Sequence, residues 1–167
     1  MIQFNWYIVL VAALVPMAVG MIWYNPRVLG SAWMRASGMT EEKAKGANKA
    51  LIFGISIFFS LMMAFVLSPI TIHQMGFLST FEGDPALADP ASPLNAYIKD
   101  YFDQYGSRFR TFKHGALHGF ITGLFLGVPA IGFNALYERK SFSYLAINAG
   151  YFILCLTLMG GIICAYL

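Results

Sequence analysis

Charged residues are scarce in this sequence and absent from four long stretches. They make up 11% of the 167 residues, whereas soluble domains carry about a quarter. The stretches without Asp, Glu, Lys or Arg are 1–26, 50–81, 114–137 and 141–167. Each exceeds the roughly 20 apolar residues that cross a bilayer as a helix. We therefore predict an all-α, four-span transmembrane helix bundle in a single domain, 1–167, with spans near 6–24, 51–71, 115–137 and 143–166.

Motifs that would indicate familiar chemistry are also missing. The sequence has no Cys-x-x-Cys, no His-Glu-x-x-His and no phosphate-binding glycine loop with lysine. No serine has a base at helical spacing with a carboxylate to orient it. The two cysteines, Cys155 and Cys164, lie on opposite faces of one helix and cannot bridge each other. We expect a protein that is not an enzyme, uses no cofactor and binds no nucleic acid.

The few basic residues predict how the chain is oriented in the membrane. The first and third connections carry seven Lys and Arg residues, and the other side carries four. The excess marks the cytoplasmic side. Both termini and the loop 73–106 are therefore predicted to be external, in a bacterial inner membrane. The start MIQFNW lacks the basic residues of a signal peptide, so we expect the first span to be retained.

The connection after the first span has the features of a membrane interface. Trp23, Tyr24 and Trp33 are predicted interfacial anchors, and Pro26 ends the helix between them. Thr40, followed by two glutamates, is a predicted helix start. From it we expect the second span to begin as a helix that extends into water.

The external loop 73–106 contains one predicted amphipathic helix. The segment LNAYIKDYFDQYG places Tyr97, Tyr101 and Tyr105 four residues apart, with charged residues on the other faces. Such a stripe is typical of a helix that lies on the membrane surface or on the bundle. We expect the three tyrosines to be interface anchors, and a partner-binding surface is the alternative.

Small residues recur every four positions in the spans. The most regular row is Gly115, Gly119, Gly123 and Gly127, and four glycines in register indicate close contact with another helix. Other candidate packing positions are Ser56, Ser60, Ala64, Gly150 and Gly161. The rows favour a compact bundle, and part of the glycine row could equally face another subunit.

A polar row runs beside the glycines. Its members are Arg110, His114, His118 and Thr122. Asn148, about one turn into the last span, is the one amide of that span. We favour hydrogen bonds from the histidines to neighbouring spans, for example to Ser60, Ser68 or Asn148. A proton or ion path is the second interpretation. Metal or haem ligation is the third, but two histidines need a further ligand and His73 is the only other histidine, so no metal site is predicted.

Two stretches together resemble a known family. They are IWYNPRVLGSAWMRASGMT, from Ile22, and HGALHGFITGLFLGVPAIGFNALYERKSFSYLAINAGYFI, from His114. The combination is similar to an uncharacterised bacterial family of small integral membrane proteins, domain of unknown function seventeen sixty-one. The residues that carry the resemblance are Trp23, Tyr24, Pro26, Gly30, Trp33, Gly38, His114, Gly115, Gly119, Pro129, Glu138, Asn148, Gly150 and Tyr151. The resemblance implies a four-span membrane protein and supplies no reaction.

Three functional hypotheses follow from these features. The leading one is a non-enzymatic membrane subunit that packs with, and stabilises or anchors, a larger membrane assembly or a homo-oligomer in the lipid bilayer. The alternative is a small transporter or proton channel that uses the polar row. The third is a haem or metal redox protein.

Overall fold

The computed structural model describes residues 5–167, and that part of the chain is helical with no strand. Four helices are long and apolar enough to cross a membrane. They are α1 (Trp6–Trp23), α4 (Lys49–Thr71), a third span built from α7 (Phe112–Thr122), the π-helix η3 (Gly123–Gly127) and α8 (Val128–Tyr137), and α9 (Phe142–Tyr166). The predicted fold class is confirmed, and each predicted span lies within a few residues of its helix.

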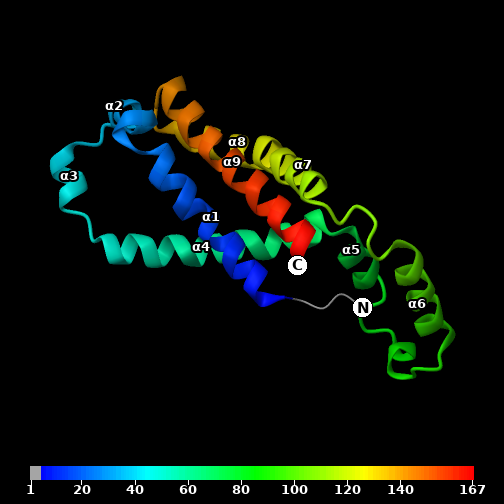
Figure 1. Ribbon diagram of the computed structural model, residues 1–167. Helices are drawn as coiled ribbons and strands as arrows, with labels where there is room; N and C mark the ends of the chain where they lie inside the picture. Colours follow the sequence, from blue (N-terminus) through cyan, green and yellow to red (C-terminus); the bar gives the residue numbers. More distant parts are fainter. Residues whose placement is uncertain (1–4) are drawn as a thin grey trace.

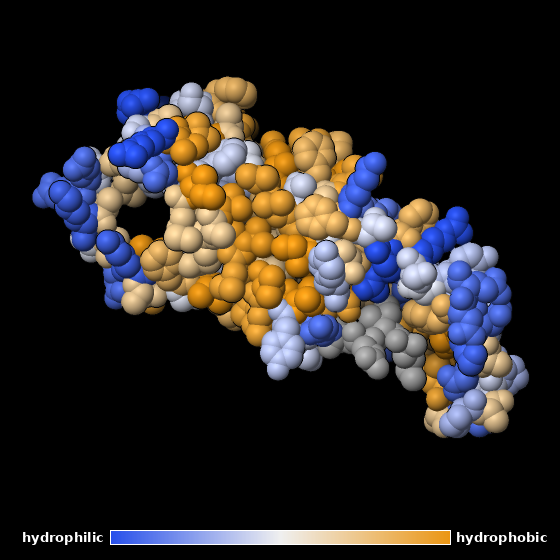
Figure 2. Space-filling view, viewed as in Figure 1, coloured by the Kyte–Doolittle hydropathy of each residue, from blue (hydrophilic) through white to orange (hydrophobic). Residues whose placement is uncertain are grey.

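Shorter elements gather at the two ends of the bundle (Figure 1). At one end lie η1 (Pro26–Gly30), α2 (Ser31–Ser37) and α3 (Glu41–Lys45). At the other end lie α5 (His73–Ser79), η2 (Pro85–Ala88) and α6 (Pro93–Tyr105). Figure 2 shows hydrophobic residues over the middle of the molecule and hydrophilic residues gathered at these ends. The distribution is that of a bundle with a lipid-facing belt and two polar ends.

The start of the second span differs from the prediction. Thr40 caps a helix as expected, because its side chain accepts a hydrogen bond from the backbone N–H of Lys43. This helix, α3, ends at Lys45. Asn48 then caps a new helix, α4, by accepting from the N–H of Leu51. Two polar caps in quick succession, with Gly46 between them, divide the segment, so α4 begins at Lys49 instead of continuing α3.

The last helix, α9, forms the centre of the bundle. Half of its span is buried, compared with 17% for the second and third spans. Its residues Leu156, Met159 and Ile163 form one core with Val9 of α1 and Leu67 of α4. The other spans therefore surround α9 and leave much of their apolar surface for lipid.

The glycine row of the third span faces α9. A Cβ placed on Gly115 would overlap the carbonyl oxygen of Gly160, and one on Gly119 would overlap that of Leu156. A Cβ on Gly123 or Gly127 would meet Ile153 or Phe152. The absence of side chains thus lets the two backbones touch. The row is filled by the same chain, so it supplies no free surface for a partner.

The remaining small residues serve more local contacts. Ser60 and Ala64 of α4 are buried, while Ser56 is half-buried. Gly150 approaches the ring of Trp23, and Gly161 approaches the ring of Phe112. The buried Cys155 and Cys164 are free thiols, as expected from their spacing.

The predicted amphipathic helix of the loop is α6, and its aromatic stripe contacts α5. The ring of Tyr101 stacks on Phe77 with centroids 3.7 Å apart, and Tyr97 lies 6.0 Å from the same ring. Tyr105 packs beside Tyr101. The centre of the stripe is therefore engaged within the protein.

Candidate metal centre

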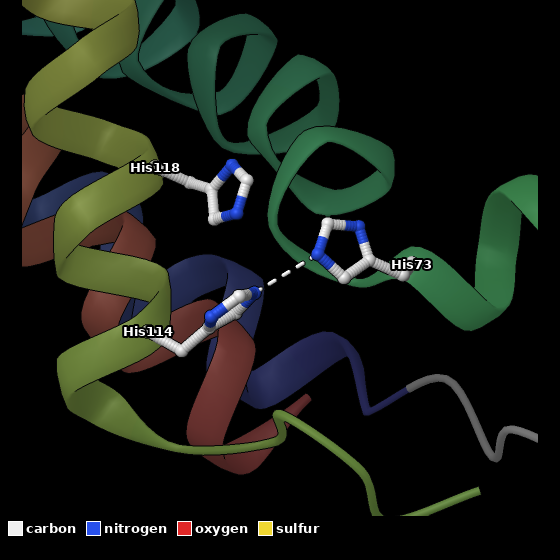
Figure 3. Close-up of side chains that lie close together, drawn as sticks. All are labelled: His73, His114 and His118. Carbon is white, nitrogen blue, oxygen red and sulfur yellow. Dashed lines mark hydrogen bonds between the residues drawn. The ribbon is translucent and has the colours of Figure 1, made fainter. Parts of the chain in front are cut away.

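Three histidines converge where α5 meets the beginning of α7 (Figure 3). They are His73, His114 and His118, the only histidines of the sequence. Their ring centroids are 5.0, 5.0 and 4.5 Å apart, so the rings form a nearly equilateral triangle. One ring nitrogen from each lies within 4.8 Å of the others. The Nε2 atoms of His73 and His114 are 3.0 Å apart.

A break between two helices delivers His73 to this position. Helix α4 ends at Thr71, and Ile72 adopts an extended backbone with φ −109° and ψ 94°. The side chain of Ile72 is fully buried and fixes the break in the core. His73 then begins α5 with its side chain exposed and directed toward α7. The change of direction at Ile72 is what turns the imidazole toward the other two.

The first turns of α7 supply the other two imidazoles. Thr111 caps this helix by accepting from the backbone N–H of His114. His118 follows four residues later, and residues at that spacing lie on one face of a helix, one above the other. Both rings are half-buried. The His-x-x-x-His pair is therefore held by a capped helix, and His73 reaches it from a separate part of the chain.

The end of α9 fixes both segments that carry the histidines. The thiol of Cys164 donates to the carbonyl oxygens of Thr71, at 3.2 Å, and of Phe109, at 3.3 Å. Arg110 also bonds to Cys164, since its Nε donates to the carbonyl oxygen of Cys164 at 2.8 Å. These bonds connect the residues just before His73 and just before His114 to the same buried residue, Cys164.

Phe109 covers one side of the histidine cluster. Its ring stacks on His114 with centroids 5.0 Å apart and meets His73 edge-on at 6.2 Å. The backbone of Phe109 has φ 64°, in the left-handed region that bulky residues rarely adopt. Such strained residues concentrate at functional sites, where surrounding contacts hold them.

The arrangement fits a transition-metal ion bound by three imidazoles. Tetrahedral zinc with Zn–N distances of about 2.0–2.1 Å separates its ligand nitrogens by about 3.3 Å. The observed separations bracket that value, since one pair of ring nitrogens is 3.0 Å apart and all three lie within 4.8 Å of one another. A hydrogen bond between two neutral imidazoles explains the contact of His73 with His114 alone. It does not explain why His118 completes the triangle.

The predicted polar row is only partly assembled. His114 and His118 belong to the cluster. Arg110 instead donates to the carbonyl oxygen of Cys164, and Thr122 donates to that of His118 in its own helix. Ser60 and Ser68, the expected partners of the histidines, likewise donate to carbonyl oxygens of α4. Asn148 lies near the opposite end of α9, where it contacts Trp33 of α2. These groups do not line one path through the bundle.

Asn148 instead organises the other membrane face. Its Oδ1 accepts from the hydroxyl of Tyr24 and from Nε1 of Trp33, both at 3.2 Å. The Tyr24 hydroxyl is protonated at neutral pH, because the ordinary pKa of tyrosine is about 10, and so it can act as this donor. Nε1 of Trp23 donates to the carbonyl oxygen of Ile147 beside it. The three aromatic residues predicted as interface anchors thus fasten α1 and α2 to α9.

Replacing Asn148 by alanine should destabilise the protein. The change leaves the Tyr24 hydroxyl and the Trp33 indole N–H without their acceptor, which costs about 2 kcal/mol of unfolding free energy. The measurement is an SDS unfolding titration in maltoside micelles. Asn134→Ala is the matched control, because Asn134 is an exposed amide on α8. Equal losses in the two variants would contradict the structural role of Asn148.

His73 is the site residue that sequence reasoning missed. The sequence names it only as the one other histidine when a further metal ligand is needed, and it is not among the predicted site residues. A topological signal was available, because the second span ends and the third span begins at the same membrane face. Residues just after the second span and residues at the start of the third span therefore lie at similar depths in the membrane. His73 and His114 are such residues.

Comparison with known proteins gives a family without an assigned activity. No curated protein and no solved structure matches the chain. One family model, described as protein of unknown function DUF1761, matches residues 7–164. The match covers nearly the whole chain, including almost all of the four apolar helices and all three histidines. The chain therefore belongs to the DUF1761 family.

Proposed function

We propose that this chain is a multi-pass membrane protein that binds one divalent transition-metal ion through His73, His114 and His118. The observation that carries the proposal is the convergence of three imidazoles from two separate chain segments into one triangle. Imidazole is a ligand for Zn²⁺, Cu²⁺, Fe²⁺ and Ni²⁺. Zn²⁺ in particular forms sites with three histidines and one open position.

The place of the cluster supports access from water. His73 is exposed, and the other two histidines lie in the first two turns of α7. The excess of Lys and Arg on the opposite connections favours an orientation in which this end faces the outside of the inner membrane. The proposed site would thus take up an ion from the external face.

The other functional hypotheses have less support. The subunit hypothesis draws on the rows of small residues and on the aromatic helix, and α9 of the same chain occupies the most regular row, that of the glycines. The channel hypothesis needed Asn148 in line with the histidines, and Asn148 is bonded to Trp33 at the other end. The three histidines need neither a partner nor a channel to act together.

The direct test is the metal content of the purified protein. The chain is exposed to excess Zn²⁺ in maltoside micelles, passed through metal-free buffer and assayed by elemental analysis. We expect one retained ion per chain. Cys155→Ala is the matched control, because the thiol that donates to the histidine-bearing segments is that of Cys164, and the variant should retain the same amount. A chain that retains no ion would overturn the proposal.

A further inference from the structure

A cavity adjoins the histidine triangle on the side of α6. Its volume is about 320 Å³, and its lining consists of His73, Gln74, Tyr101, Tyr105, Arg108 and Phe109. His73 belongs both to the triangle and to this wall. A molecule in the cavity would therefore lie beside a metal ion held by the three imidazoles. The volume is at the lower end of the range for small-molecule sites.

The charges around the triangle leave a bound ion uncompensated. Three neutral imidazoles add no charge to a divalent cation. The segments that carry the histidines, 43–81 and 104–137, contain no Asp or Glu, and neither does α9. On α6, Asp103 is paired with Lys99, and Asp100 accepts from Gln104. An ion at the triangle would thus favour an anion from outside the protein at its fourth position.

Arg108 is held where it could pair with such an anion. The buried amide of Gln74 donates to the carbonyl oxygens of Tyr105 and Arg108, both at 2.9 Å. Because Gln74 directly follows His73, the backbone of Arg108 is tied to the neighbour of a proposed ligand. Its guanidinium lies over the rings of Tyr105 and Phe109, 5.6 and 5.2 Å from their centroids. Neither ion pair found within residues 5–167 involves Arg108.

The geometry points to an anion-binding site in this cavity, and this inference rests on the proposed metal site. The ligand is a small molecule or headgroup with a phosphate or carboxylate group. One of its oxygens takes the open coordination position of the metal, and Arg108 pairs with the remaining charge. Tyr101 and Tyr105 form the aromatic wall around the rest of the ligand.

The test uses Co²⁺ in place of Zn²⁺, because the visible absorption of tetrahedral Co²⁺ reports its ligands. The protein is loaded to full occupancy in maltoside micelles, which contain neither phosphate nor carboxylate, and titrated with inorganic phosphate. We expect saturable changes in the Co²⁺ bands. Arg108→Gln should weaken the apparent phosphate affinity at least tenfold. Lys113→Gln, a nearby cation that does not line the cavity, should leave it within about twofold.

The outcomes separate this inference from the proposed function. Failure to load Co²⁺ would overturn the metal site and this inference with it. Loading without a phosphate response, or an equal response in Arg108→Gln, would overturn the anion site alone. Repeating the titration in phosphatidylglycerol nanodiscs identifies the source of the anion. Bands that already match the phosphate-bound form and no longer respond indicate a lipid headgroup, whereas a retained response indicates a soluble anion.

Discussion

Replacing Gly119 by alanine is expected to lower the unfolding free energy by about 3 kcal/mol. The new Cβ would overlap the backbone carbonyl of Leu156, and a backbone carbonyl cannot rotate out of the way as a side chain can. Helices α7 and α9 would have to separate along the whole glycine row. The measurement is the midpoint of an SDS unfolding titration in maltoside micelles.

Gly54→Ala is the matched control for this prediction. Gly54 is also a glycine within a membrane-spanning helix, but a Cβ there would meet nothing within 4 Å. Alanine favours a helix over glycine by about 0.8–1.0 kcal/mol in soluble hosts, so this variant should be neutral or slightly stabilised. If Gly119→Ala were as stable as Gly54→Ala, the close contact between α7 and α9 would be wrong.

Replacing His118 by alanine is expected to weaken Zn²⁺ binding at least 100-fold. Changing a residue that only hydrogen-bonds to a metal ligand typically weakens metal affinity 10–100-fold. His118 would itself supply one of three ligands, so its loss should have a larger effect. His118 takes no part in the hydrogen bond between His73 and His114. The variant should therefore unfold like the wild type in metal-free buffer and differ only when metal is present.

Zn²⁺-dependent stability provides the readout for His118. An ion at 100 times its dissociation constant stabilises a folded protein by about 2.7 kcal/mol. The wild type and Cys155→Ala should gain this stability, and His118→Ala should gain almost none. Equal gains in all three proteins would mean that the ion binds away from the triangle.

The spans were predictable because the bilayer imposes one simple physical requirement. A stretch such as 141–167 has no charge over a length that crosses the hydrocarbon core, and α9 occupies nearly all of it. Helix starts were predictable where a cap is local, as at Thr40. The division of α3 from α4 was not predicted, because Asn48 competes for the same segment as a second cap.

Long-range relations were harder to predict from sequence. The glycine row indicated that Gly119 touches another helix, but spacing within one helix does not identify the helix it meets. The histidine pair indicated one face of α7, but not the third imidazole. His73 reaches it through the extended backbone at Ile72 and the anchoring of Thr71 by Cys164, and both depend on tertiary contacts.

The turn before α6 forms its hydrogen bonds locally, and this affects which insertions and deletions the family can tolerate. The Asn95 amide donates to the carbonyl oxygens of Ala86, Leu87 and Asp89, while Ser92 caps the same helix. These hydrogen bonds join residues of the turn to the start of α6, and none of them involves the histidine triangle. Insertions and deletions among homologues should accumulate between Gly83 and Ser92, where evolution can lengthen or trim the chain without moving His73.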